Sequence, residues 1–258
     1  MSSVSIPETF PNLPASVQKI QKMYASQSVA IPTLVALLES EPLLAANILK
    51  LVNSPYYGLS AKVSSINGAV MLLGTTVIRG IILATILKKS FPLDLSVYGI
   101  TVAQFETISI LRAKLLKEWL QNTDVDTQSL SLAAFLMESG KIVMAHEIAK
   151  NSLKTEFVAL CQIQSQEEAE MELFGVQSYS VASALFLQWQ FDDAFCALIG
   201  SVTNPQSSDA KILHALQIAI NTKNIFDADE IAKAKEFLDI HALYGDAFLQ
   251  SVEKIKKI

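Results

Sequence analysis

The chain has 258 residues, of which 51% are hydrophobic, with a formal net charge of −5 at pH 7 and a pI near 5.3. This apolar content is enough to fill one large or two small hydrophobic cores. The negative charge argues against a nucleic-acid partner, because phosphate contacts need a dense positive field, and only Arg79 and Arg112 could offer a guanidinium to a phosphate.

The sequence carries no pattern typical of export or of a membrane span. Its first ten residues, MSSVSIPETF, have neither the basic segment nor the apolar segment of a signal peptide. Apolar runs such as residues 80–87 are shorter than the roughly 18–20 residues that cross a bilayer. Cys161 and Cys196 lie far apart and outside any CxxC spacing, which suits a reducing compartment. We therefore predict a cytoplasmic protein with no membrane contact.

The N-terminal third of the chain predicts short amphipathic helices after an extended lead-in at residues 1–14. Apolar residues at helical spacing indicate helices near 16–24, 28–40, 41–52 and 65–74, and a further one from residue 75. Gly74 is expected to end one of these helices and Thr75 to cap the next. The segment 88–98, with a proline at 92, interrupts the periodicity and is the best internal joint.

A second joint, at residues 53–58, presents two adjacent tyrosines. Asn53 and Ser54, followed by a proline, are expected to stop the preceding helix, and Gly58 permits a turn. Tyr56 and Tyr57 could then form an exposed amphipathic anchor for a protein partner, or they could seal two lobes of the fold together. These five residues are our candidate partner-binding residues.

The rest of the chain also predicts helices. They are expected near 101–119, 129–149, 156–173, 178–191, 192–202, 209–221, 228–239 and 245–257. The helix at 129–149 is the most apolar and is expected to be central to a second lobe, whereas the acidic run 166–172 is expected to be a solvated face. The polar connector 203–209 separates the last three helices from the others. Because no alternating strand pattern occurs, we predict an all-α protein.

Three consecutive segments resemble the HDOD domain, an HD-related output domain of bacterial signalling proteins. They read ILKLVNSPYYGL, SSINGAVMLLG and TVIRGIIL, and they follow the Glu41-Pro42 start of a helix. The resemblance covers roughly the first four fifths of the chain. It implies an all-α, two-lobed helical bundle in which an N-terminal helical lobe at about 15–90 precedes an HD-like lobe at about 98–204, both within a domain at 15–204. A C-terminal helical extension at 205–258 would follow.

The resemblance also implies where a metal site would lie. Catalytic members of the HD superfamily hold metals with histidines and a His-Asp pair, but Met137 and Glu138 stand at that pair here, and Ile108 and Ser178 stand about where other histidines are expected. A thioether cannot replace an imidazole for a hard cation. We therefore predict no metal site, no cofactor and no catalytic residue. Glu138 either binds one weak cation as a relic or, as we favour, pairs with Lys141 three residues later.

Three functions remain open at this point. The first, which we favour, is a non-catalytic signalling module that binds a kinase, a response regulator or a cyclic-dinucleotide enzyme in trans. The second is a divergent metal-dependent phosphohydrolase with ligands recruited from Glu138, His146 and the run 166–172. The third is a regulatory binder of a small nucleotide, which the scarcity of arginine disfavours. The Walker loop, the GxSxG elbow and the GxGxxG motif are all absent from the sequence.

Overall fold

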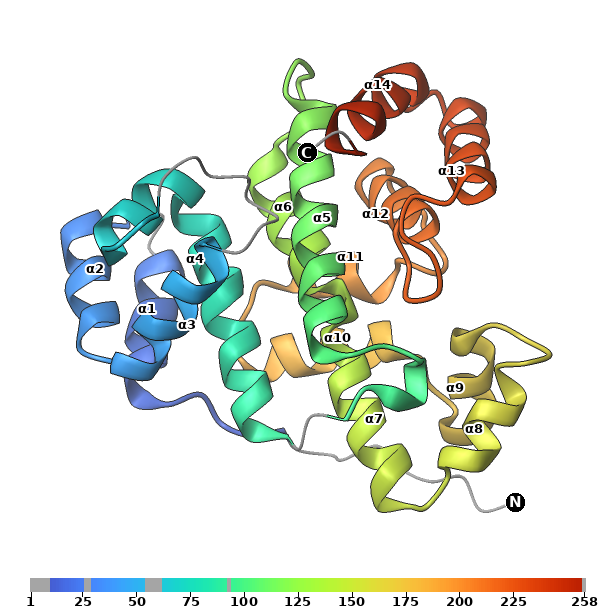
Figure 1. The fold of residues 1–258 in the computed structure, drawn as a ribbon, viewed down its shortest axis with the longest axis horizontal. Helices are drawn as coiled ribbons and strands as arrows, with labels where there is room; N and C mark the ends of the chain where they lie inside the picture. Colours follow the sequence, from blue (N-terminus) through green and yellow to red (C-terminus); the bar gives the residue numbers. More distant parts are fainter. Residues whose placement is uncertain (1–9, 26–28, 54–61, 92–93, 257–258) are drawn as a thin grey trace. The chain divides into compact units, whose positions relative to one another are not determined.

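The computed structural model describes residues 10–25, 29–53, 62–91 and 94–256 (Figure 1). Secondary structure in these ranges is helical apart from one isolated antiparallel bridge between Ile220 and Ile225. The all-α prediction is therefore confirmed for the part of the chain that is described.

The chain forms two compact units. One is Pro11–Ser90, here called the N-terminal unit, and the other is Phe91–Ile258, here called the C-terminal unit. Phe10 joins the C-terminal unit, because the side-chain amide of Gln188 accepts a hydrogen bond from its backbone nitrogen (2.8 Å) and donates one to its carbonyl oxygen (2.6 Å). The last helices of the chain, at 205–258, belong to the same unit as the predicted HD-like lobe.

Among its described residues, the N-terminal unit has the helices α1 (Ala15–Ala25), α2 (Ile31–Glu39), α3 (Pro42–Val52) and α4 (Ile66–Ser90). A proline stands in the first turn of both α2 and α3, where its missing N–H would have no helical partner in any case. Both helices pack against α4. The buried side chains of these helices include Leu34, Leu38, Ile48, Val52, Ile78 and Ile81.

Helix α4 is broken in its middle by Gly74. This residue has φ 78° and ψ 159°, a conformation that is accessible to glycine and strained for other residues. The predicted end of one helix at Gly74 and start of the next at Thr75 are therefore confirmed. By length and by its mean hydropathy of 2.1, Ile66–Ser90 would also suit a membrane span, and this apolar stretch is longer than the sequence pattern suggests. However, 61% of it is buried inside the protein, as in a core helix.

The C-terminal unit is built from α-helices and two short 3₁₀ segments. They are η2 (Ser96–Tyr98), α5 (Val102–Leu120), α6 (Thr127–Leu136), η3 (Met137–Ser139), α7 (Gly140–Lys150), α8 (Lys154–Leu160), α9 (Gln166–Phe174), α10 (Ser178–Gln188), α11 (Asp193–Gly200), α12 (Ser208–Ala219), α13 (Ala228–Ile240) and α14 (Gly245–Lys256). The long helix α5 packs against α6 and α14, α10 packs against α7 and α11, and α12 packs against α13 (Figure 1). The indole of Trp119 on α5 meets the ring of Phe248 on α14 edge to face at 5.2 Å.

The single helix expected at 129–149 is wrong. Helix α6 ends at Leu136, a 3₁₀ turn follows at Met137–Ser139, and α7 starts at Gly140. Such a 3₁₀ stretch in the middle of a helical run often marks local strain or a functional site. The lack of space beside Gly140 explains why the helix is interrupted here. A Cβ atom at Gly140 would lie 1.8 Å from the carbonyl oxygen of Ser178. The backbone of α10 therefore passes directly against the start of α7.

The helix expected at 156–173 is also divided. Helix α8 ends at Leu160 and α9 begins at Gln166. Ser165 caps α9, since its hydroxyl accepts a hydrogen bond from the backbone of Glu168 (3.1 Å) while the Glu168 carboxylate accepts one from the backbone of Ser165 (2.8 Å). This capping box fixes the start of α9 and, with it, the position of the acidic run.

Candidate functional site

The carboxylate of Glu138 lies at the centre of a buried charged cluster. Its side chain is 2% exposed. The Nη1 atom of Arg112 lies 2.8 Å from Oε1, and the Nζ atom of Lys141 lies 3.1 Å from Oε2. The hydroxyl of Tyr179 donates a hydrogen bond of 2.9 Å to Oε1. Three helices, α5, α7 and α10, thus each send one side chain to the 3₁₀ turn that carries Glu138.

The two cations hold Glu138 in its charged form. Burial raises the pKa of Glu138, but the charges of Lys141 and Arg112 and the hydrogen bonds that they make outweigh burial and lower the pKa to about 2. Burial lowers the pKa of Lys141, and the carboxylates of Glu138, Glu167 and Glu170 raise it above its usual value. The expected ion pair of Glu138 with Lys141 is present.

Arg112 is the partner of Glu138 that sequence reasoning missed. It is fully buried, and its Nε atom donates a hydrogen bond of 2.8 Å to the carbonyl oxygen of Ile220, at the end of α12. A signal for this role exists in the sequence. Arg112 lies four residues after Ile108 and three before Leu115, and both of these are core positions of α5. An arginine on that stripe must meet a buried acceptor or anion.

The positions that the resemblance assigns to a metal site do not fit a divalent cation. Ile108 and Met137 are buried and offer no hard donor atom, and Ser178 is buried and offers a neutral hydroxyl. The single carboxylate, that of Glu138, already faces two positive side chains, which would repel a metal ion. In the described ranges, no three His, Cys, Asp or Glu side chains converge to hold an ion.

The histidines of the C-terminal unit pack against aromatic rings. The ring of His146 lies 5.6 Å from that of Phe91. His214 and His241 lie on either side of Phe237, at 4.9 and 4.7 Å between ring centroids. These contacts are typical of histidines that fill space beside a core.

The acidic run 166–172 is only in part the solvated face that the sequence pattern predicts, since Glu168 and Glu172 are exposed while Glu170 is buried. Gln166 and Glu170 are buried on the same side of α9 as Ala169 and Phe174, so the polar side chains occupy core positions. The Glu170 carboxylate accepts a hydrogen bond from the hydroxyl of Tyr98 (2.7 Å) and one from the backbone nitrogen of Ser178 (2.7 Å). Burial raises the pKa of Glu170 to about 7, although the charge of nearby Lys141 acts in the opposite direction.

The raised pKa of Glu170 predicts a loss of stability as the pH rises. Above the unfolded-state pKa of about 4.5, the unfolded chain releases this proton while the folded protein keeps it up to about pH 7, so the free energy of unfolding falls across that window. The lowered pKa of Glu138 acts only below about pH 4.5. We expect Glu170→Gln to make this decrease in the free energy of unfolding smaller by at least about 1 kcal/mol. The measurement is urea unfolding near pH 5 and near pH 8. The exposed Glu172→Gln on the same helix is the control, and equal slopes for the Glu170→Gln variant and wild type would contradict the prediction.

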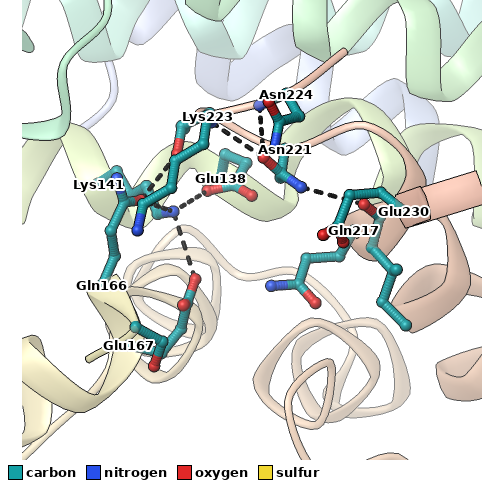
Figure 2. Close-up of a pocket in the computed structure, with 12 residues that line it drawn as sticks. Glu138, Lys141, Gln166, Glu167, Gln217, Asn221, Lys223, Asn224 and Glu230 are labelled. Atoms are coloured by element: carbon teal, nitrogen blue, oxygen red, sulfur yellow. Dashed lines mark hydrogen bonds and ion pairs between the residues drawn. The ribbon is translucent and has the colours of Figure 1, made fainter. Parts of the chain in front are cut away.

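A polar cavity of about 220 Å³ opens beside Glu138 and Lys141 (Figure 2). We call it the Lys141 cavity. It is lined by Glu138, Lys141, Ser165, Gln166, Glu167, Gln217, Ile218, Asn221, Thr222, Lys223, Asn224 and Glu230. Figure 2 shows Lys141, Lys223 and Gln166 on one side of it and Gln217 and Glu230 on the other. The cavity is thus formed where η3 and the start of α9 meet the end of α12 and the start of α13.

Side-chain hydrogen bonds hold the walls of the Lys141 cavity in place. The carbonyl oxygen of the Gln166 side chain accepts hydrogen bonds from Lys141 Nζ (3.0 Å) and from the Thr222 hydroxyl (2.8 Å). The Asn221 side chain accepts from the backbone nitrogens of Lys223 (2.9 Å) and Asn224 (2.7 Å), which fixes the turn after α12. The C-terminal helices, to which the sequence assigned no role, therefore supply half of this cavity.

Of the candidate partner-binding residues, only Asn53 falls in the described ranges. Its side chain donates hydrogen bonds to the carbonyl oxygens of Leu49 (2.7 Å) and Val63 (2.8 Å) and accepts one from the backbone nitrogen of Val63 (2.8 Å). Asn53 therefore ties the end of α3 to the segment that leads into α4. Ser54, Tyr56, Tyr57 and Gly58 lie outside the described residues.

Comparison with family models decides the identity of the fold. The model of the HDOD domain matches residues 10–205. The chain belongs to the HDOD domain family. The match includes the 3₁₀ turn with Glu138 and the start of α9, and it ends before α12, so only part of the Lys141 cavity comes from the HDOD region. Comparison with curated proteins gives no match.

Solved structures share the fold of this HDOD chain. A protein from Shewanella amazonensis SB2B, provisionally named a phosphohydrolase, has 20% identity and a TM-score of 0.74, with 96% of this chain and 90% of that chain covered. An HDOD domain protein of unknown function from Geobacter sulfurreducens has 19% identity and a TM-score of 0.67, with 96% and 90% covered. A provisionally named signal transduction protein from Marinobacter aquaeolei VT8 has 18% identity and a TM-score of 0.66, with 96% and 60% covered.

Proposed function

We propose that this HDOD protein is a non-catalytic regulatory module of bacterial signal transduction that acts in the cytoplasm by binding other signalling proteins in trans. A kinase, a response regulator or a cyclic-dinucleotide enzyme would be such a partner. The proposal rests on the ion pairs that Glu138 makes. This carboxylate, at a position where the superfamily's metal site would lie, is neutralised inside the core by Arg112 and Lys141.

The charged cluster supports a structural role for the former metal position. In a metal-dependent enzyme, the cation at such a site faces the substrate and water. Here two protein cations take the place of that positive charge, and Arg112 uses a further nitrogen to bind α12. The cluster therefore joins η3, α5, α7, α10 and the end of α12 through buried protein side chains.

A second observation supports binding to a protein partner. Met71 and Leu72, adjacent on α4 in the N-terminal unit, are 67% and 50% exposed. Exposed apolar side chains of this size can contribute contact area to a protein interface. They follow in sequence the joint that carries Tyr56 and Tyr57. We therefore assign partner binding to the N-terminal unit.

A capture experiment tests the partner-binding proposal. The tagged full chain is used to capture proteins from the bacterial cytoplasm, and the same defined partner is expected to be lost with Tyr56→Ala/Tyr57→Ala, with Met71→Ser/Leu72→Ser, or with both. Ile163→Ser, at a residue that is 81% exposed on the C-terminal unit, is the matched control and should retain the partner. Capture that none of these variants changes would overturn the assignment to the N-terminal unit.

A metal analysis tests the non-catalytic part of the proposal. Purified protein is expected to contain iron, manganese and zinc far below one ion per chain and to leave phosphodiester substrates unchanged. A stoichiometric metal together with metal-dependent hydrolysis, abolished by Glu138→Gln, would replace the proposal with a divergent phosphohydrolase.

A further inference from the structure

We propose that the Lys141 cavity binds a small zwitterion, a molecule that carries one carboxylate and one ammonium group, such as a free α-amino acid. The inference goes beyond the proposed function, because it is tested on the isolated chain without a partner protein. It follows from the size of the cavity, from the charges on its two sides and from the helix ends that face it.

The size of the cavity limits the ligand to a small molecule. Its volume of about 220 Å³ is that of about seven waters at liquid density. Sites for drug-sized ligands are larger, roughly 300–1,000 Å³. A complete nucleotide, with its base, sugar and phosphate, belongs to that larger class. A free amino acid fits the available space.

The charged residues that line the cavity favour a ligand with a positive and a negative group over a ligand whose charges all have the same sign. The lysines Lys141 and Lys223 line the same cavity as the carboxylates of Glu138, Glu167 and Glu230. A phosphate-rich anion would face three carboxylates, and a divalent cation would face two ammonium groups, so each would meet repulsion. A molecule that is neutral overall but charged at both ends avoids this cost.

The inner charges of the cavity are largely buried and paired with one another, whereas the outer charges lie where the cavity opens to solvent. Lys141 lies 3.1 Å from Glu138 and 3.4 Å from Glu167. Lys223 is exposed and stands on the side of the cavity near Lys141, whereas Glu230 stands on the opposite side (Figure 2). Lys223 is therefore placed to bind a carboxylate at one end of the cavity. At the other end, Glu230 is paired with Lys233 (2.9 Å), but Lys233 is 63% exposed and does not line the cavity, and so solvent-screened a pair holds the carboxylate only weakly. Glu230 can therefore still bind an ammonium group.

Two helix ends of opposite polarity reinforce this arrangement. The first turn of α9, at Gln166 and Glu167, lines the cavity, and a helix N-terminus favours a negative group. The last turn of α12, at Gln217 and Ile218, lines it too, and a helix C-terminus favours a positive group. The side-chain amides of Gln217 and Asn224 can donate to a carboxylate or accept from an ammonium group. The site thus has built-in polarity.

Calorimetric titration of the full chain with each standard L-amino acid tests the inference. We expect at least one amino acid to bind with a dissociation constant below about 1 mM. Its N-acetyl derivative, which lacks the positive charge, and its carboxamide, which lacks the negative charge, are each expected to bind at least about tenfold more weakly. Adenosine monophosphate is titrated in the same way as the representative of the competing class of ligand, the nucleotides.

Matched variants locate the binding. Lys223→Gln and Glu230→Gln are each expected to weaken binding of the amino acid at least about tenfold. The control is Lys150→Gln, at an exposed lysine that does not line the cavity, and this variant should bind the amino acid as wild type does. Circular dichroism confirms that each variant is folded. Absence of binding by every amino acid, unchanged affinity in both cavity variants, or displacement of the amino acid by adenosine monophosphate at lower concentration would each overturn the inference.

Discussion

Replacement of Glu138 by glutamine is expected to destabilise the protein by about 3–5 kcal/mol, because it removes the carboxylate that pairs with buried Arg112 and leaves buried Lys141 with only the more distant carboxylate of Glu167, at 3.4 Å. With a pKa of about 2, Glu138 is fully charged at neutral pH, and both Arg112 and Lys141 lie within 3.1 Å of it. Glutamine keeps the size of the side chain and can still accept the hydrogen bond from Tyr179. The difference in free energy of unfolding, measured with urea at pH 7, therefore reports the lost charge.

The control for this experiment is Glu253→Gln on α14. Glu253 is 65% exposed and lies 3.9 Å from Lys256, so its removal should change the stability by less than about 1 kcal/mol. The combined variant Arg112→Leu/Glu138→Leu/Lys141→Met removes all three charges and should recover much of the loss. If Glu138→Gln cost no more than Glu253→Gln, the carboxylate would not be needed to neutralise the cluster, and its role as a relic metal ligand would be open again.

The N-terminal unit follows closely from the sequence. Prolines at the first turns of α2 and α3 and the break at Gly74 are local signals, each with a direct backbone cause. The apolar spacing of α2 and α3 then tells which side is buried. Local rules were sufficient here, since the described helices of this unit bury mainly apolar side chains, and the buried hydroxyl of Thr85 on α4 bonds within its own helix, to the carbonyl oxygen of Ile81.

The charged cluster could not be predicted from the same local rules. Periodicity places Arg112 on the buried stripe of α5 and Glu138 in an apolar run, but it cannot tell that these two meet across 26 positions of sequence. The burial of Gln166 and Glu170 in the acidic run was missed for a related reason. A row of glutamates reads as solvated unless a partner is known, and the partners of Glu170 are Tyr98 and the backbone of Ser178, which come from other elements. Pairing of buried polar groups is a tertiary property.

The cavity could not be predicted for a further reason. Its residues come from η3, α7, the start of α9, α12, α13 and the turn between α12 and α13, and the sequence divided these between a domain and an extension. The hydrogen bonds between Thr222 and Gln166 and between Arg112 and Ile220 reveal that the last helices complete the site.

Replacement of Gly140 by alanine is expected to destabilise the protein by about 3 kcal/mol. In an ordinary helix this exchange stabilises by about 1 kcal/mol. At Gly140, however, the new methyl group would lie 1.8 Å from the carbonyl oxygen of Ser178, which is backbone and cannot rotate away. Helix α10 would have to move from α7. Gly200→Ala is the matched control, since its methyl group would meet only the side chain of Ser183, at 3.3 Å, and we expect a change within about 1 kcal/mol.

The movement of α10 has a second consequence that distinguishes it from simple crowding. Tyr179 follows Ser178 directly, and its hydroxyl binds Glu138. If Gly140→Ala displaces α10, that hydrogen bond is already weakened, so Tyr179→Phe should cost less in the Gly140→Ala background than in wild type. A double-mutant cycle from urea unfolding measures this coupling, expected at about 1 kcal/mol. Strict additivity would contradict it, because it would mean that the contact between α7 and α10 does not position Tyr179 and that Glu138 is held by its two cations alone.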